Sequence, residues 1–291
     1  MDQLAEAVGF GVVTAAVLAL AAVGLTLQLG VTNFVNFAYG DFMTFGAYVA
    51  FAANVLGMNF FLAVIIGGIA TGLLALAANI IVFRPFVRRG SRVVTFLILT
   101  LGLSFIVQNG VIILWGTGAK RYNVTLGTAM NLGPFLLTPG DLALIGTAAL
   151  LLLALHLTLQ YTTFGKSLRA TSNNRDLARA CGIDTEMLTN WTWLISGFFA
   201  AIAGAGLVLE TYTLRPTVGF NELFFIFAAI ILGGIGKPYG AMLGALIIGI
   251  VTEVSGMYMN SGYKAAFAFA ILVLVLLLRP QGLFAARGRS E

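Results

Sequence analysis

Apolar residues occur in long runs along the chain, separated by short polar segments. We interpret nine of these runs as membrane-spanning helices, because most are near the roughly 20 residues that a helix needs to cross about 30 Å of hydrocarbon. The run at 222–236 is short and rich in glycine at its end, and the boundary near 30–33 is weakly marked, so eight spans with one re-entrant segment is an alternative. The pattern predicts an all-α transmembrane bundle, with spans at roughly 8–30, 33–55, 60–83, 93–115, 141–161, 188–209, 222–236, 239–257 and 264–279.

Composition supports a membrane protein. Hydrophobic residues make up 59% of the 291 residues and charged residues only 9%, whereas about 25% of an ordinary soluble domain is charged. This leaves too little polar surface for a water-soluble globule, which excludes a soluble enzyme, a disordered chain and a nucleic-acid-binding domain. Cys181 is the single cysteine, so no internal disulfide can form. No Lys or Arg precedes the first apolar run, so we expect that run to be a retained span and not a cleaved signal peptide.

The distribution of Lys and Arg predicts the orientation. With nine crossings and the N-terminus outside, twelve of the 16 basic residues fall in inside segments and four in outside segments. Cytoplasmic loops are enriched in Lys and Arg, so the rule favours an outside N-terminus and an inside C-terminus. We find no further soluble domain and treat 1–291 as one transmembrane domain, with the segment 162–187 as a cytoplasmic loop within it.

Several enzymatic chemistries are missing from the sequence. Gly165-Lys166-Ser167 resembles the end of a phosphate-binding loop, but the first glycine of that motif is replaced by Gln160. The chain contains no zinc-protease or serine-hydrolase motif and a single histidine, His156, which we interpret as a packing residue. We therefore predict no enzymatic activity, no catalytic residue, no metal site and no cofactor-binding residue in this chain.

The loop 162–187 is the most informative polar segment. Ser172, Asn173 and Asn174 are residue types that cap helix N-termini, Gly182 suits a left-handed helix end, and Asp184 can cap the next helix, which becomes the following span. We predict a short helix over 175–181 that carries Arg175 and Arg179 on one face. Such a helix either rests on anionic lipid or docks a cytoplasmic partner, and the spacing alone does not decide between the two.

The loop also resembles the coupling loop of ATP-driven (ABC) importer permeases, and most closely that of the branched-chain amino acid permease family. The resemblance rests on Gly165–Ala170 (GKSLRA) and Ala178–Asp184 (ARACGID), and it extends to Asn33–Asp41 (NFVNFAYGD), Ile231–Gly236 (ILGGIG) and Arg279–Phe284 (RPQGLF). The motifs follow the family's order over nearly the whole chain. One departure is Asp176-Leu177-Ala178, where generic importers have Glu-Ala-Ala.

The resemblance implies a permease subunit that translocates branched-chain or related apolar amino acids across a bacterial inner membrane. It implies four kinds of partner or ligand: a second related permease, two ATPase subunits that bind the ATP, an extracytoplasmic solute-binding protein and the amino acid itself. It also implies that Arg169, Arg175, Arg179 and Gly182 take part in coupling to the ATPases. The same family type imports urea, short amides and other amino acids, which remain alternatives.

Polar residues within apolar spans indicate where a solute could pass, because they are costly in hydrocarbon and usually face a cavity or a partner. Glycine-rich stretches at 24–46 and 219–244 are typical of broken helices near a transport pathway. We select Asn33, Asn36, Asp41 and Glu222 as pathway candidates, although a simple tertiary hydrogen bond is an equal alternative for Asp41. Gly236, Gly240 and Gly244 recur every four residues and predict close helix packing, possible at a subunit interface.

An ion-coupled transporter that works alone is a less favoured alternative. It would need a proton- or sodium-binding constellation in the spans, for which Asp41 and Glu253 are the obvious carboxylates. It would also leave the capped cytoplasmic loop without a role.

Overall fold

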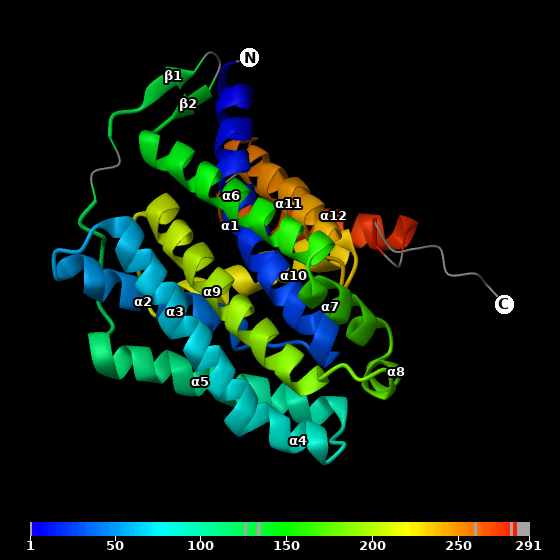
Figure 1. Ribbon diagram of the computed structural model, residues 1–291. Helices are drawn as coiled ribbons and strands as arrows, with labels where there is room; N and C mark the ends of the chain where they lie inside the picture. The colour runs from blue at the N-terminus through cyan, green and yellow to red at the C-terminus, as the bar shows by residue number, and fades with distance from the viewer. Residues whose placement is uncertain (1, 125–126, 133–134, 259–260, 280–281, 284–291) are drawn as a thin grey trace.

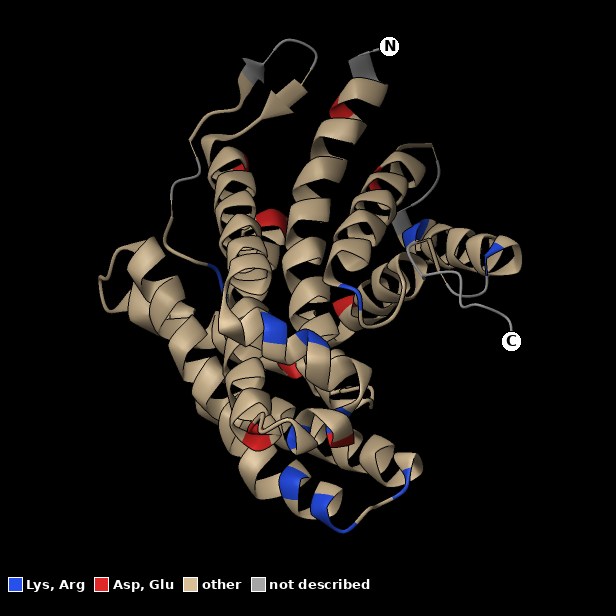
Figure 2. Ribbon diagram, turned by 45° about the vertical axis from the view of Figure 1, so that its right-hand side comes forward, with Lys and Arg blue, Asp and Glu red and all other residues tan. Residues whose placement is uncertain are grey.

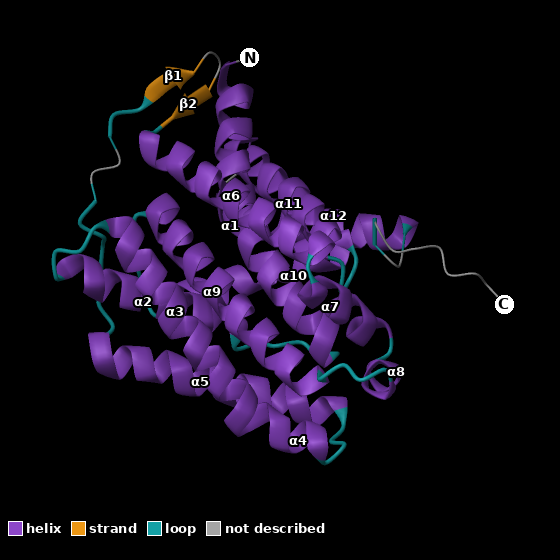
Figure 3. Cartoon of the chain, viewed as in Figure 1, coloured by secondary structure: helices purple, strands orange, loops and turns teal. Residues whose placement is uncertain are grey.

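The computed structural model describes residues 2–124, 127–132, 135–258, 261–279 and 282–283, and over these the chain is almost entirely helical (Figure 3). Pro280, Gln281 and Phe284 of the C-terminal motif, and Arg287 and Arg289 of the tail, lie outside the described residues. The helices are α1 (Asp2–Thr32), α2 (Tyr39–Val55), α3 (Phe60–Ala78), α4 (Arg84–Arg88), α5 (Val93–Trp115), α6 (Pro139–Tyr161), α7 (Thr163–Asn173), α8 (Arg175–Ala180), α9 (Thr185–Thr211), α10 (Val218–Gly233), α11 (Pro238–Tyr258) and α12 (Lys264–Leu278). A π-helical turn, Asn79–Phe83, joins α3 to α4, and a 3₁₀ turn, Ser261–Tyr263, precedes α12.

Each of the nine predicted apolar runs contains a helix, but the helices differ in length. Among the described residues, six helical stretches are long and apolar enough to cross a membrane: α1, α3 with its extension through α4, α5, α6, α9 and α11. The other three helices are shorter, with 17 residues in α2, 16 in α10 and 15 in α12. At 1.5 Å per residue, α12 is only about 22 Å long. The all-α polytopic class is therefore confirmed, and six of the nine predicted spans contain helices long and apolar enough to cross a membrane.

The predicted span 33–55 is wrong at its start, because α2 begins only at Tyr39. Asn33 takes a left-handed conformation with φ of 56° and ends α1. The side-chain oxygen of Asn36 then accepts a hydrogen bond from the Ala38 N–H at 3.1 Å, which holds a turn before the helix. The turn-forming preferences of Asn33 and Asn36 therefore prevent a helix over the first residues of this predicted span.

The helices pack around α1 and α9, which are the most buried (Figure 1). α1 lies against α11 and α9 and also contacts α6 and α10, while α9 packs on α3 and α2. α5 contacts mainly α2, and α12 contacts α11 and α10. α3, α5 and α6 carry many exposed Ile, Leu and Val side chains, which in a membrane protein are suited to lipid or to another subunit.

Small residues allow this close packing. A side chain at Gly204 of α9 would collide with the Met43 carbonyl of α2, and one at Gly249 of α11 would meet the Ala15 backbone of α1 at 2.6 Å. The first turns of α2 and α10 also meet through glycine, at Gly40 and Gly219. The short helix α10 is thereby placed against both α2 and α11.

The connection between α5 and α6 contains a feature that the all-α prediction did not include. Two short strands, β1 (Met130–Leu132) and β2 (Phe135–Leu137), form an antiparallel pair in which Met130 faces Leu137. Lys120 and Leu214 exchange two backbone hydrogen bonds of 2.9 Å, which tie this connection to the segment before α10. The hairpin lies beside the N-terminus, at the end of the molecule opposite α4 and α8 (Figure 1).

Candidate functional site: the loop between α6 and α9

The segment 162–187 folds into two short helices, α7 and α8, between two long ones. α8 covers Arg175–Ala180, close to the predicted 175–181. The Asn174 side chain accepts hydrogen bonds from the Asp176 and Leu177 N–H groups at 3.1 and 3.0 Å, which confirms the predicted cap. Gly182 takes φ of 84°, and the N–H of Ile183 bonds to the Ala178 carbonyl at 3.0 Å, a geometry that ends helices at glycine.

The helix α7 was not predicted, although the sequence contains a weak signal for it. Thr162 caps α7 by accepting a hydrogen bond from the Gly165 N–H at 3.4 Å. A side chain at Gly165 would collide with the Leu159 carbonyl, so glycine lets α7 turn back onto the end of α6. Arg169 donates to that same carbonyl. Arg169 thus closes the corner between α6 and α7.

The other two loop arginines differ in their contacts. Arg179 donates from Nε to the Thr185 hydroxyl at 2.8 Å, which joins α8 to the first turn of α9. Arg175 is half-buried, and its Nε has no hydrogen-bond partner among the described residues. Burial lowers the pKa of Arg175 and the neighbouring Arg179 charge lowers it further, whereas Asp176 raises it. An arginine remains protonated in proteins, so Arg175 keeps its positive charge at this partly buried position.

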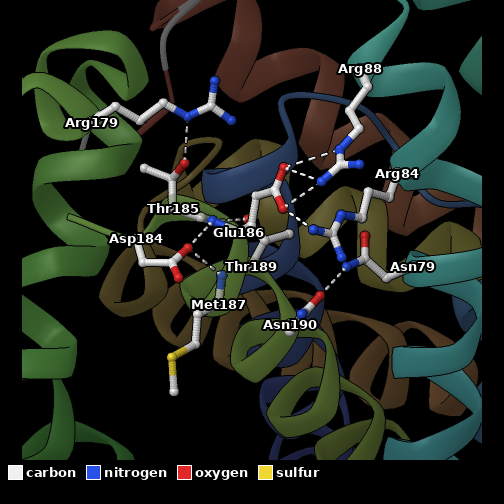
Figure 4. A network of polar contacts seen from close by, with 10 residues as sticks. All are labelled: Asn79, Arg84, Arg88, Arg179, Asp184, Thr185, Glu186, Met187, Thr189 and Asn190. Carbon is white, nitrogen blue, oxygen red and sulfur yellow. Dashed lines mark hydrogen bonds and ion pairs between the residues drawn. The ribbon is translucent and has the colours of Figure 1, made fainter. Parts of the chain in front are cut away.

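A polar network fixes the start of α9 (Figure 4). Asp184 caps the helix by accepting from the Glu186 and Met187 N–H groups at 3.0 and 2.9 Å, as predicted. Glu186 accepts hydrogen bonds from Arg84 and Arg88 of α4, the latter at 2.9 to 3.2 Å. This pairing was missed, because sequence reasoning used the α4 arginines only to set the orientation.

A second contact in the network is an amide pair. The Asn79 side chain, in the π-helical turn, donates to Asn190 of α9 at 2.8 Å. Together with the Glu186 contacts, it attaches the start of α9 to the end of the α3–α4 helix. The start of α9, which follows the loop directly, is thus bonded to the end of the α3–α4 helix at two places.

The network borders a cavity of about 580 Å³ between α4, α8 and α9. Four arginines line it, Arg84, Arg88, Arg175 and Arg179, against the two carboxylates of Asp184 and Glu186. Beside it, the loop exposes the apolar side chains of Leu177 and Met187 and the thiol of Cys181. Basic segments in general gather at this end of the molecule, away from the N-terminus (Figure 2). The site is thus a positively charged surface with an apolar tip, held rigidly on two spanning helices.

Comparison with known proteins decides the family. A family model described as the permease component of the branched-chain amino acid transport system matches residues 7–276. The chain belongs to the branched-chain amino acid transport permease family. This family is a transport component and not an enzyme family, which confirms the prediction from the missing catalytic motifs.

Individual relatives agree with the family match. The chain is 32% identical over 303 residues to the high-affinity branched-chain amino acid transport system permease protein LivH of Escherichia coli K12, covering 97% of this chain and 94% of that protein. It is 31% identical to a probable LivH of Methanocaldococcus jannaschii, with 91% and 88% covered. The ribose import permease RbsC of E. coli K12 is 24% identical, with 89% and 81% covered. The solved structure of PsaBC from Streptococcus pneumoniae in complex with Fab shares the fold, with a TM-score of 0.50, 13% identity, and 94% and 91% of the chains covered.

The four pathway candidates of this branched-chain permease occupy different surroundings. Asn33 is exposed at the end of α1. Asn36 is buried and donates to the Gln28 side chain at 3.0 Å, and Asp41 is buried and accepts from the Ser104 hydroxyl of α5. Glu222 lines a separate cavity near the ends of α9 and α11. Asn36 and Asp41 thus hold helices together, whereas Glu222 faces open space.

The three packing glycines of the branched-chain permease also divide. A side chain at Gly240 would collide with the Gly233 carbonyl of α10, and one at Gly244 with the Ala229 carbonyl. These two glycines therefore bring α10 and α11 together within one chain. Gly236 departs from the predicted series, because it precedes α11 and takes φ of 77° in the turn after α10. Gly236 therefore lies in a turn and does not belong to the packed face of α11.

Proposed function

We propose that this chain is the permease subunit of an ATP-driven importer for branched-chain or related apolar amino acids in a cell inner membrane. The observation that carries the proposal is the charged loop 162–187 in a chain of the branched-chain permease family: it is rigidly capped, basic and bonded to two spanning helices. The sequence contains no phosphate-binding loop, so ATP binds to separate ATPase subunits. A second related permease and an extracytoplasmic binding protein complete the proposed complex.

In this proposal, the loop is the surface that the ATPase contacts. Arg175 supports the assignment, since it is a half-buried cation whose Nε lacks a partner in the described chain. Arg179 and Arg169 hold α8 and α7 in place, and Gly182 gives the chain its turn into α9. Movement of an ATPase against this loop would reach α9 through Asp184 and α3–α4 through Glu186.

The orientation follows from the same surface. We place the end with α4, α7 and α8 in the cytoplasm, because cytoplasmic loops are enriched in Lys and Arg. The N-terminus and the β1–β2 hairpin then face outside, and nine crossings include the short helices α2, α10 and α12. We further propose that the pathway passes between the glycine-rich helices, with Asn33, Asn36, Asp41 and Glu222 near it.

Reconstitution tests the function. The chain is purified with its partner subunits and placed in proteoliposomes. Uptake of L-leucine, urea, acetamide and ribose is then measured with and without ATP inside the vesicles, and with and without the binding protein outside them. We expect leucine uptake only when both are present. Robust leucine uptake by this chain alone, driven by a proton or sodium gradient, would show that it is a secondary transporter instead.

A further inference from the structure

A second charged cavity lies at the opposite end of the molecule from the basic loop. It has a volume of about 450 Å³ and is lined by residues of α1, α9, α10, α11 and α12 and by Gly262 before α12. Three glutamates reach it from three helices: Glu210 from α9, Glu222 from α10 and Glu253 from α11. Lys264, at the start of α12, is the basic residue in its lining. The lining therefore has more carboxylates than cations.

The contacts show which carboxylate is neutralised. Lys264 donates from Nζ to Glu253 Oε1 at 2.7 Å, which pairs these two charges. Glu210 Oε1 accepts from the Thr14 hydroxyl, but Glu210 Oε2 is buried and has no hydrogen-bond partner among the described residues. Glu222 lies near the Lys264 charge, but no hydrogen bond or ion pair joins it to another residue of the described chain. Burying an ionised carboxylate without a partner is unfavourable and is relieved either by a proton or by a cationic group, and the cavity has room for such a group from outside.

The rest of the lining is suited to an apolar group. Aliphatic and aromatic side chains from α1, α9 and α10 form an apolar wall of the cavity, namely Phe10, Val17, Leu18, Leu207 and Phe225. Lys264 also has three N–H donors, of which Glu253 takes one. The two remaining N–H groups of Lys264 can donate hydrogen bonds to an anion beside the three glutamates. The volume lies within the range of about 300 to 1,000 Å³ that is usual for small-molecule sites.

We propose that this cavity binds a zwitterionic amino acid with an apolar side chain, and that it is a solute site of the permease. Glu210 and Glu222 take the ammonium group, Lys264 takes the carboxylate, and the wall formed with Phe10 and Phe225 takes the side chain. An inorganic cation would satisfy the glutamates but would leave that apolar wall unused. The inference rests on the proposed importer function and adds the place at which the solute is held. In the proposed orientation the cavity lies in the outer half, where a binding protein releases its solute.

The test uses a cysteine reporter in the complete complex held in nanodiscs. Cys181, the single native cysteine, is changed to Ser, and Ala265→Cys is introduced because Ala265 lines the cavity without contributing a charge. The rate of modification by a cationic methanethiosulfonate reagent is measured with L-leucine, with isopentylamine, which lacks the carboxylate, and with 4-methylpentanoate, which lacks the amine. We expect leucine to protect best, isopentylamine to protect less and 4-methylpentanoate to give no protection.

Matched variants link protection to the glutamates. Glu222→Gln should raise the leucine concentration needed for half-protection by about tenfold, the effect of losing one charge-assisted hydrogen bond. Ala266→Cys, on the adjacent exposed residue outside the lining, should show no protection. Thr211→Cys, which lines the cavity from α9, is a second reporter in case Ala265→Cys does not assemble.

Two results would overturn the inference. One is a complex that imports leucine under ATP while leucine protects neither reporter, which would leave the importer function intact. The other is equal protection by leucine and 4-methylpentanoate, which would remove the role of the glutamates. Protection in a complex that imports no amino acid would instead count against the importer function and in favour of the site.

Discussion

At the scale of single residues, buried polar groups fix the broken region between α1 and α2. Asp41 lies in the first turn of α2, is fully buried and accepts a hydrogen bond from Ser104 of α5. Removing the partner of a buried polar group costs about 1 to 3 kcal/mol, because the desolvated group is left without its bond. Since α5 contacts mainly α2, this single bond matters for how α5 is held.

Ser104→Ala should therefore destabilise the protein. We expect a lower midpoint of thermal unfolding in detergent, measured by tryptophan fluorescence, than for the wild-type chain. Thr26→Val is the control, since the Thr26 hydroxyl is also buried within a helix but has no hydrogen-bond partner in the described chain, and valine keeps the side chain's shape. An equal loss of stability in both variants would contradict the role assigned to the Asp41–Ser104 bond.

At the scale of elements, the sequence predicted features that depend on neighbouring residues and missed features that depend on distant ones. The cap at Asn174, the turn at Gly182 and the cap at Asp184 each involve residues within a few positions, and all three are present. Glu186 and Arg84 are 102 positions apart, so no local pattern could pair them. Helix α7 was missed for a different reason. It contains few apolar residues, so its sequence is similar to that of a polar loop. The glutamate cavity needs five helices in place before its charges meet.

Helix packing in this bundle depends on particular glycines. A side chain at Gly204 would collide with the Met43 carbonyl, whereas one at Gly102 of α5 would meet no atom within 4 Å among the described residues. Gly204→Val should prevent α9 from packing on α2 and strongly reduce the yield of folded protein. Gly102→Val, also within a helix, should be tolerated, because valine favours the helix more than glycine does. Similar yields of monodisperse protein by size-exclusion chromatography for the two variants would contradict this packing.

At the scale of the whole molecule, an arginine-rich cavity and a glutamate-rich cavity lie at opposite ends. Arginines gather around α4 and α8, while the cavity with three glutamates lies near the ends of α9 and α11. In the proposed importer, the basic end meets the ATPases and the acidic cavity meets the incoming amino acid. α9 connects them, because its first turn belongs to the loop network and Glu210 lies near its last residue.

Cys181 allows a direct test of this arrangement, because it is exposed and is the single cysteine. A membrane-impermeant maleimide should label it in inside-out vesicles stripped of peripheral subunits, but not in intact cells. An Asn123→Cys, Cys181→Ser variant, with its cysteine in the connection between α5 and α6, should show the reverse pattern. Labelling of Cys181 in intact cells would place the loop outside and would contradict the proposed orientation.

The most direct test of the central claim, that an ATPase drives this permease through the loop 162–187, is the ratio of leucine import to ATP hydrolysis in the reconstituted complex. Reversing the charge of both Arg175 and Arg179 to Glu should either release the ATPase subunits or lower this ratio by about tenfold or more, since the basic surface that meets the partner becomes acidic and α8 loses its bond to Thr185. Arg92→Glu, an exposed charge reversal between α4 and α5 and outside both the loop and the arginine-lined cavity, should leave the ratio near the wild-type value. A doubly reversed complex that keeps its ATPases and imports leucine at the wild-type ratio would contradict the claim.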